Sequence, residues 1–158
     1  MLSQTPITFT LCNKIWQMSM QIWVDGAFNH KTKEAGLGIL IREIIPNGTK
    51  ETRLHVKTKA EDNNQAELLA IYNALQHIKG SPRSEPIFII TDSQIAIESI
   101  LHPETKKDKY REIAERIRGM LYCERWKIYH KKAHTGRRDR YSIYQDLADK
   151  LAKSLDFS

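Results

Sequence analysis

The chain has 158 residues, 41% of them hydrophobic, which is enough for one compact domain with a full core. Its 25 Lys and Arg against 19 Asp and Glu give a net charge of +6, which fits a protein that approaches phosphate groups but fits many others too. Cys12 and Cys123 are too few for a disulfide framework or a zinc site, and no apolar run approaches the ~20 residues of a membrane span. We therefore expect a cytoplasmic protein without membrane contact.

Residues 1–19 are expected to form an N-terminal extension, for which disorder and an alternative start are both open, and residues 20–158 to form the single domain. The apolar segment at residues 7–11 follows no basic residue and precedes no small-residue cleavage site, which argues against a signal peptide. No function is assigned to this extension.

The next part of the chain predicts three strands, at residues 21–25, 36–41 and 49–56. The second strand is a continuous apolar run, and the Pro46-Asn47-Gly48 turn makes the third strand return antiparallel to it. Polar and apolar residues alternate in the third strand, which is typical of a half-exposed edge.

After residue 65 the apolar residues recur at helical spacing, which predicts a helix that ends at Gly80. A β-branched run at residues 87–91 predicts a strand buried on both faces. Helices at 93–101 and 110–121, a strand at 126–129 and a helix at about 147–155 complete the chain. This order predicts an α/β fold, in which helices flank a mixed five-stranded sheet whose first three strands are antiparallel.

Four acidic residues lie where such a fold can bring them together. Asp25 and Asp92 end apolar strands, while Glu67 and Asp149 lie within helical patterns. In open sheets of this kind ligands bind beyond the strand ends. Carboxylates gathered there repel one another unless divalent cations neutralise them, and two Mg²⁺ or Mn²⁺ ions on oxygen ligands can clamp both oxygens of a phosphodiester displacement.

Each acid also has a simpler interpretation. Asp25 can be a turn residue, and Glu67 lies three residues after Asn64, as in a capping box at a helix start. Asp92 can be the N-cap of the following helix, and Asp149 an exposed acid on an amphipathic helix. For Glu67 taken alone, the capping box is the favoured interpretation. The joint arrangement of the four acids favours a metal site.

The sequence resembles type 1 ribonuclease H from about residue 21 to residue 155. Each matching motif is weak alone, but together they occur in the family's order with suitable gaps. The matching positions are Asp25-Gly26; Gly36 and Gly38; Asn63, Asn64, Glu67 and Leu68; Thr91 to Gln94; and Ala148, Asp149, Leu151 and Ala152.

The resemblance implies a ribonuclease H-like fold and endonucleolytic hydrolysis of the RNA strand of RNA/DNA hybrids by two Mg²⁺ (or Mn²⁺) ions. By resemblance, the metal ligands and catalytic acids are Asp25, Glu67, Asp92 and Asp149, and His134 assists in a basic loop. Asp146, three residues before Asp149, competes for the fourth position, but the Ala-Asp-x-Leu-Ala frame selects Asp149.

The family pattern also implies how the hybrid is held. Gly26, Asn63, Asn64, Ser93 and Gln94 would contact it, with the amide side chains reading the minor groove and the 2′-OH that marks RNA. A monomer is expected.

The chain departs from the pattern at several positions: Asp62 replaces a frequent Thr, which puts a phosphate contact in doubt, Gln145 replaces an Asn, and the loop after Asp25 lacks its Gly and Pro residues.

Two other classes of function remain open from the sequence. One is a nucleic-acid-binding module that kept this fold without catalysis. The other is a related nuclease of a Holliday-junction resolvase or of a retroelement polymerase. Substrate competition and a test of metal-independent binding would distinguish them.

Overall fold

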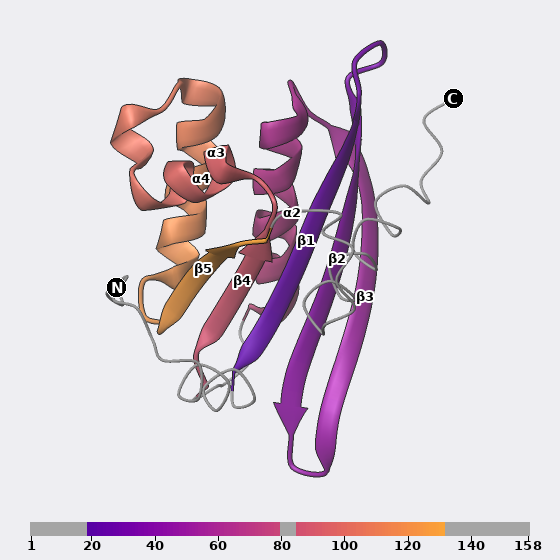
Figure 1. Ribbon diagram of the computed structural model, residues 1–158, viewed down its shortest axis with the longest axis vertical. Helices are drawn as coiled ribbons and strands as arrows, with labels where there is room; N and C mark the ends of the chain where they lie inside the picture. The colour runs from indigo at the N-terminus through magenta and orange to yellow at the C-terminus, as the bar shows by residue number, and fades with distance from the viewer. Residues whose placement is uncertain (1–18, 80–84, 132–158) are drawn as a thin grey trace.

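The computed structural model describes residues 19–79 and 85–131. Within these ranges the chain forms one sheet and helices that pack against it (Figure 1). In chain order the elements are β1 (Met20–Asn29), β2 (Glu34–Ile45), β3 (Gly48–Lys59), α2 (Asn63–Ile78), β4 (Ile87–Thr91), α3 (Gln94–Leu101), the short 3₁₀ helix η1 (Pro103–Thr105), α4 (Asp108–Leu121) and β5 (Trp126–His130).

The sheet has the strand order β3-β2-β1-β4-β5. β1 pairs antiparallel with β2, and β2 antiparallel with β3, whereas β4 runs parallel to both β1 and β5. The predicted mixed sheet with three antiparallel starting strands is therefore confirmed, as is the position of β3 at an edge. The predicted helix at 147–155 lies outside the described residues.

The first three strands are longer than their apolar patterns indicated. β1 continues through Gly26 to Asn29, and β2 already begins at Glu34, because the main chains of residues 26–29 and 34–37 still pair with one another. Hydrophobic periodicity marks the buried part of a strand, while backbone pairing needs no apolar side chain. The two strands therefore form a hairpin that extends beyond the core.

The helices share one core with the sheet. Side chains of β1 and β4 alternate, so Ile22, Val24 and Ile89 face the apolar stripes of α2, α3 and α4. Trp23, Leu40 and Phe88 belong to the opposite face, and these side chains are fully buried too. β4 is buried along its whole length, as its β-branched run predicted.

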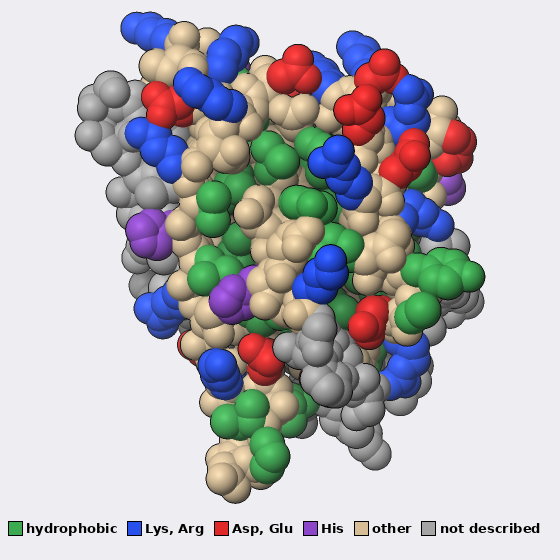
Figure 2. Space-filling view, turned by 180° about the vertical axis from the view of Figure 1, so that it is seen from behind, with side chains coloured by type: hydrophobic (Ala, Val, Ile, Leu, Met, Phe, Trp, Pro, Cys, Tyr) green, Lys and Arg blue, Asp and Glu red, His purple; other side chains and the backbone are tan. Residues whose placement is uncertain are grey.

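Charged side chains cover much of the surface. Figure 2 shows Lys and Arg side chains around the rim of one face, with Asp and Glu among them and hydrophobic side chains nearer the centre. The excess positive charge is therefore spread rather than gathered into one block on this face. Among the helices of residues 19–79 and 85–131, none combines the length and apolar character that a bilayer crossing requires.

Candidate active site

Three of the four predicted acids meet where the inner strand β4 ends beside β1. Trp23 of β1 pairs in parallel with Ile90 of β4, so Asp25, in the middle of β1, and Asp92, directly after the end of β4, lie next to each other two residues further on. Glu67 reaches this place from the first turns of α2, and carboxylate oxygens of the three residues lie within 4.8 Å of one another. Asp149, Asp146 and His134 lie outside the described residues, so their roles stay predictions.

Both oxygens of Glu67 are held by hydrogen bonds from the two strands. The Gly26 N–H donates to Oε1 at 2.8 Å, and the Thr91 hydroxyl donates to Oε2 at 2.9 Å. The same Gly26 N–H also lies 3.0 Å from an oxygen of Asp25. Glu67 is therefore oriented toward the middle of β1 and the end of β4 before any ligand arrives.

A glycine is needed at position 26 because β1 and α2 approach closely there. A Cβ atom on Gly26 would lie 3.0 Å from the Cβ of Ala66 and 3.2 Å from the backbone nitrogen of Glu67. Contacts this short force the strand and the helix apart, since backbone atoms cannot move aside as a flexible side chain can. Gly26 thus lets α2 approach β1 closely enough for Glu67 to reach Asp25 and Asp92.

The electrostatics of this cluster favour a cation. Burial raises the pKa of Glu67 well above its ordinary value, and the nearby Asp25 and Asp92 carboxylates raise it further, while the Gly26 hydrogen bond opposes the shift. Asp25 is also buried, and Asp92 is half-buried. Hard divalent ions such as Mg²⁺ take carboxylate oxygens as ligands and offset this repulsion. The donor set therefore fits such an ion.

The capping interpretations of Glu67 and Asp92 are wrong. The N-cap of α2 is Asp62, whose Oδ1 accepts a hydrogen bond from the Gln65 N–H at 2.8 Å. The N-cap of α3 is Ser93, whose hydroxyl accepts from the Ala96 N–H at 3.0 Å. Because Asp62 and Ser93 accept the backbone N–H groups at the helix starts, Glu67 and Asp92 remain available for the acidic cluster.

The predicted substrate-binding residues lie at the starts of α2 and α3. Asn63 and Gln94 are the first residues of these helices, and both are exposed. Asn64 is half-buried, and its Oδ1 accepts a hydrogen bond from the Ser93 hydroxyl at 3.0 Å. The two helix starts are thus joined beside Asp92, which directly precedes Ser93.

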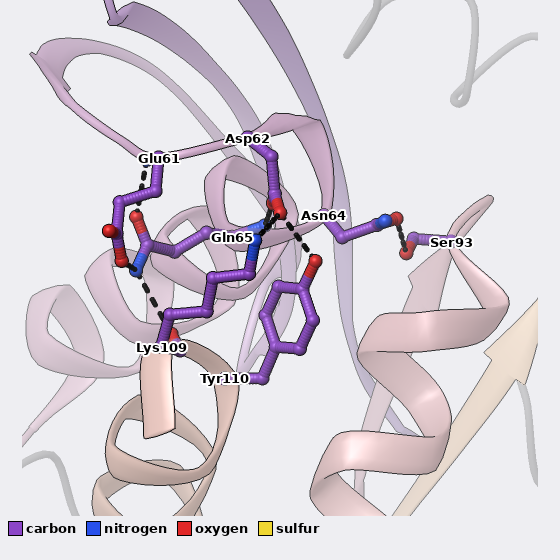
Figure 3. Close-up of polar contacts among 7 residues, drawn as sticks. All are labelled: Glu61, Asp62, Asn64, Gln65, Ser93, Lys109 and Tyr110. Carbon is purple, nitrogen blue, oxygen red and sulfur yellow. Dashed lines mark hydrogen bonds and ion pairs between the residues drawn. The ribbon is translucent and has the colours of Figure 1, made fainter. Parts of the chain in front are cut away.

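Sequence reasoning missed two groups of residues around this site. The first is Thr91, whose hydroxyl holds Glu67 by a hydrogen bond. The position of Thr91 directly before Asp92 was the sequence feature that could have indicated this role. Figure 3 shows the second group, in which Asp62 faces Lys109 and Tyr110 of α4. Asp62 and Tyr110 are 48 positions apart, and no local pattern relates residues at that separation.

Comparisons with known proteins agree with this architecture. The family model described as RNase H matches residues 17–155. No curated protein has a significant match to the sequence. Among solved structures, the RNase H1 of the halophilic archaeon Halobacterium salinarum is similar with a TM-score of 0.64 and 21% identity, over 87% of this chain and 99% of that one.

Two further solved structures are similar at low identity. The prototype foamy virus protease-reverse transcriptase aligns with a TM-score of 0.76 and 21% identity over 100% of this chain, which spans only 23% of that protein. LC9-RNase H1, described as a type 1 RNase H with the type 2 active-site motif, aligns with a TM-score of 0.69 and 15% identity over 96% of this chain and 74% of that one. At these identities the likeness shows the fold.

Proposed function

The chain belongs to the RNase H family, and from that premise we propose that it hydrolyses the RNA strand of RNA/DNA hybrids endonucleolytically, with two Mg²⁺ or Mn²⁺ ions. The observation that carries this proposal is the meeting of Asp25, Glu67 and Asp92 where β4 ends beside the middle of β1. Buried carboxylates this close together are costly to maintain, and a metal-dependent nuclease gives them a use.

The three acidic side chains would each act as a metal ligand, in positions set by the residues that hold them. Asp25 lies within β1 and Asp92 directly after the adjacent β4, and both would supply carboxylate ligands to the ions. Glu67 would complete one ion's ligand set in an orientation already fixed by Gly26 and Thr91. When bound, the ions would stabilise the charge that develops on the attacking and leaving oxygens of the phosphodiester.

Two residues from the C-terminal part of the chain belong to this proposal. By the family motif, Asp149 would complete the second ion's ligands. His134 would orient the attacking water or help the product leave, because an imidazole with a pKa near ~6.5 can change charge at working pH. Both assignments rest on the matching motifs.

Hybrid recognition would occur at the helix starts. Asn63, Asn64 and Gln94 are amides that can donate to and accept from sugar hydroxyls and base edges, with Gly26 and Ser93 beside them. Two of these amides are exposed next to the acidic cluster. Because the net charge is only +6, we expect moderate affinity that falls as salt rises.

A related function is the ribonuclease H part of a longer retroelement polymerase. The alignment with the foamy virus protease-reverse transcriptase, of which the chain spans 23%, favours this context as a second candidate. The chemistry would be the same, so the two candidates differ in what lies beside the domain. The monomeric state stays a prediction.

The test is cleavage of an end-labelled RNA/DNA hybrid beside matched RNA duplex, DNA duplex and single strands, with Mg²⁺, Mn²⁺ or EDTA. We expect RNA-strand cleavage confined to the hybrid, lost in EDTA and in Asp92→Asn. Glu112→Gln, which removes an exposed acid of α4, is the matched control and should cleave normally. Retained hybrid binding without cleavage under any metal would make the chain a binding module instead.

A further inference from the structure

Three helix starts meet beside the acidic cluster. Asp62 is the N-cap of α2, Ser93 is the N-cap of α3, and Tyr110 lies in the first turn of α4. Figure 3 shows their side chains, with those of Asn64 and Lys109, lined up across the three helices. The first turn of α2, which carries the proposed hybrid-reading amides, is thus linked to a helix that carries no proposed metal ligand.

Asp62 is the centre of this junction. Its Oδ1 accepts the Gln65 N–H inside α2, while its Oδ2 accepts the Tyr110 hydroxyl and lies 2.7 Å from the Lys109 ammonium. Burial raises the pKa of Asp62, but the hydrogen bonds from Lys109, Tyr110 and Gln65 lower it by more, so this pKa lies below its ordinary value. The carboxylate is therefore held in its charged form by α4.

A second link runs through Gln65. Its side-chain amide donates to the Lys109 carbonyl at 2.9 Å, and its side-chain oxygen accepts the Glu61 N–H at 2.7 Å. The start of α2 is therefore fixed to α4 from two positions, the N-cap Asp62 and Gln65 in the first turn. Exposed hydrogen bonds contribute little one by one, but several of them together fix an orientation.

Asn64 lies between the two neighbouring helices. Its Oδ1 accepts the Ser93 hydroxyl on one side. On the other side lies Tyr110: burial and the hydrogen bond to Asp62 raise the pKa of the phenol, while a hydrogen bond with Asn64 opposes the shift. The half-buried Asn64 amide is consequently held by Ser93 at the start of α3, while α4 acts on its helix turn through the N-cap Asp62.

We propose that Tyr110 is a positioning residue for hybrid recognition: through Asp62, the N-cap of α2, it fixes the helix turn whose Asn64 amide is proposed to read the minor groove. This inference rests on the proposed function. Glu67 is held separately, by Gly26 and Thr91 of the strands, so the loss of the Tyr110 hydroxyl should leave the metal site in place. The effect should therefore fall on substrate binding and not on the chemical step.

The experiment compares Tyr110→Phe, which removes only the hydroxyl, with Tyr122→Phe, which alters a tyrosine that is 86% exposed. Cleavage kinetics on the hybrid give kcat and KM, and hybrid binding in EDTA gives a readout independent of catalysis. We expect Tyr110→Phe to raise KM and Kd about 3–10-fold, the loss of one ordinary hydrogen bond, with kcat retained. Tyr122→Phe should match the unaltered chain.

A double-variant cycle separates this role from simple packing. If Tyr110 acts through Asn64, Tyr110→Phe should add nothing to KM in an Asn64→Ala background. A lower melting temperature with unchanged KM and Kd, or additive effects in the double variant, would overturn the inference. If the unaltered chain binds and cleaves no hybrid, the proposed function fails; if it cleaves and Tyr110→Phe cleaves with the same KM, the inference alone fails.

Discussion

Replacing Glu67 by Gln should stabilise the metal-free protein and abolish its hybrid cleavage. Gln keeps the size of the side chain, and its carbonyl oxygen can still accept the Gly26 N–H. Its amide can donate to the Thr91 hydroxyl, which donates to Glu67 in the unaltered chain. The substitution therefore removes one negative charge from a buried cluster and leaves no cavity.

The size of the effect follows from the separation of the carboxylates. Oxygens within 4.8 Å, at an effective dielectric constant of about 20, repel by about 3.5 kcal/mol for each fully ionised pair. Solvent that reaches the half-buried Asp92 screens part of this repulsion, while burial and the neighbouring acids disfavour the ionised form of Glu67 and raise its pKa. We therefore expect about 1–3 kcal/mol of added stability at neutral pH, with a melting temperature higher by about 2–4 °C for each kcal/mol.

The pH dependence has a definite sign. A carboxyl whose native pKa is raised destabilises the folded state in full above that native pKa, and the cost disappears as the pH falls below the unfolded pKa. The advantage of Glu67→Gln should accordingly be largest at neutral to alkaline pH and vanish in acid. Added Mg²⁺ should stabilise the unaltered chain more than the variant, because the ion offsets the same repulsion.

Thermal unfolding in EDTA, at neutral pH and again near the ordinary Glu pKa, measures the stability difference, and hybrid cleavage with Mg²⁺ measures the activity. Glu112→Gln removes an exposed acid and should leave both unchanged. A Glu67→Gln variant that melts below the unaltered chain in EDTA at neutral pH, or that still cleaves, would refute this reasoning.

Three further results are expected. Gly26→Ala should lower the free energy of unfolding by about 1–3 kcal/mol in denaturant titrations and reduce cleavage, since its Cβ would meet α2; Gly119→Ala, whose Cβ meets nothing within 4 Å, should do neither. Thr91→Val should weaken Mg²⁺ binding about 10–100-fold in calorimetric titrations while Thr91→Ser restores it, because the hydroxyl orients Glu67. Asp62, with its lowered pKa, should stabilise the fold above the ordinary value near 3.8 and lose this contribution as pH falls below it; acid melting curves of Asp62→Asn should lack that component.

The sheet could be predicted from the sequence because burial leaves a periodic trace. The β-branched run of β4 and the turn before Gly48 were enough to place the strands, and parallel pairing then brought Asp25 and Asp92 together. The ends of the strands could not be predicted, since residues 26–29 pair with residues 34–37 through main-chain hydrogen bonds that need no apolar pattern.

The candidate site was predictable only in part, because its supports are not local. Taken alone, Glu67 was better explained by a capping box, and only the fold shows that Asp62 caps α2 and that Gly26 and Thr91 hold Glu67. Tyr110 approaches Asp62 across 48 positions of sequence, so no motif could have indicated it. Asp149 and His134 remain predictions from their motifs.

The edge strand β3 has a consequence for how copies of this protein behave beside one another. It is 12 residues long, and within the described sheet it pairs with β2 on one side. Long unpaired edges invite strand addition and aggregation, yet the exposed positions of its second half alternate through Arg53, His55, Lys57 and Lys59. Like charges brought into register would repel, so this edge discourages one copy from extending the sheet of another.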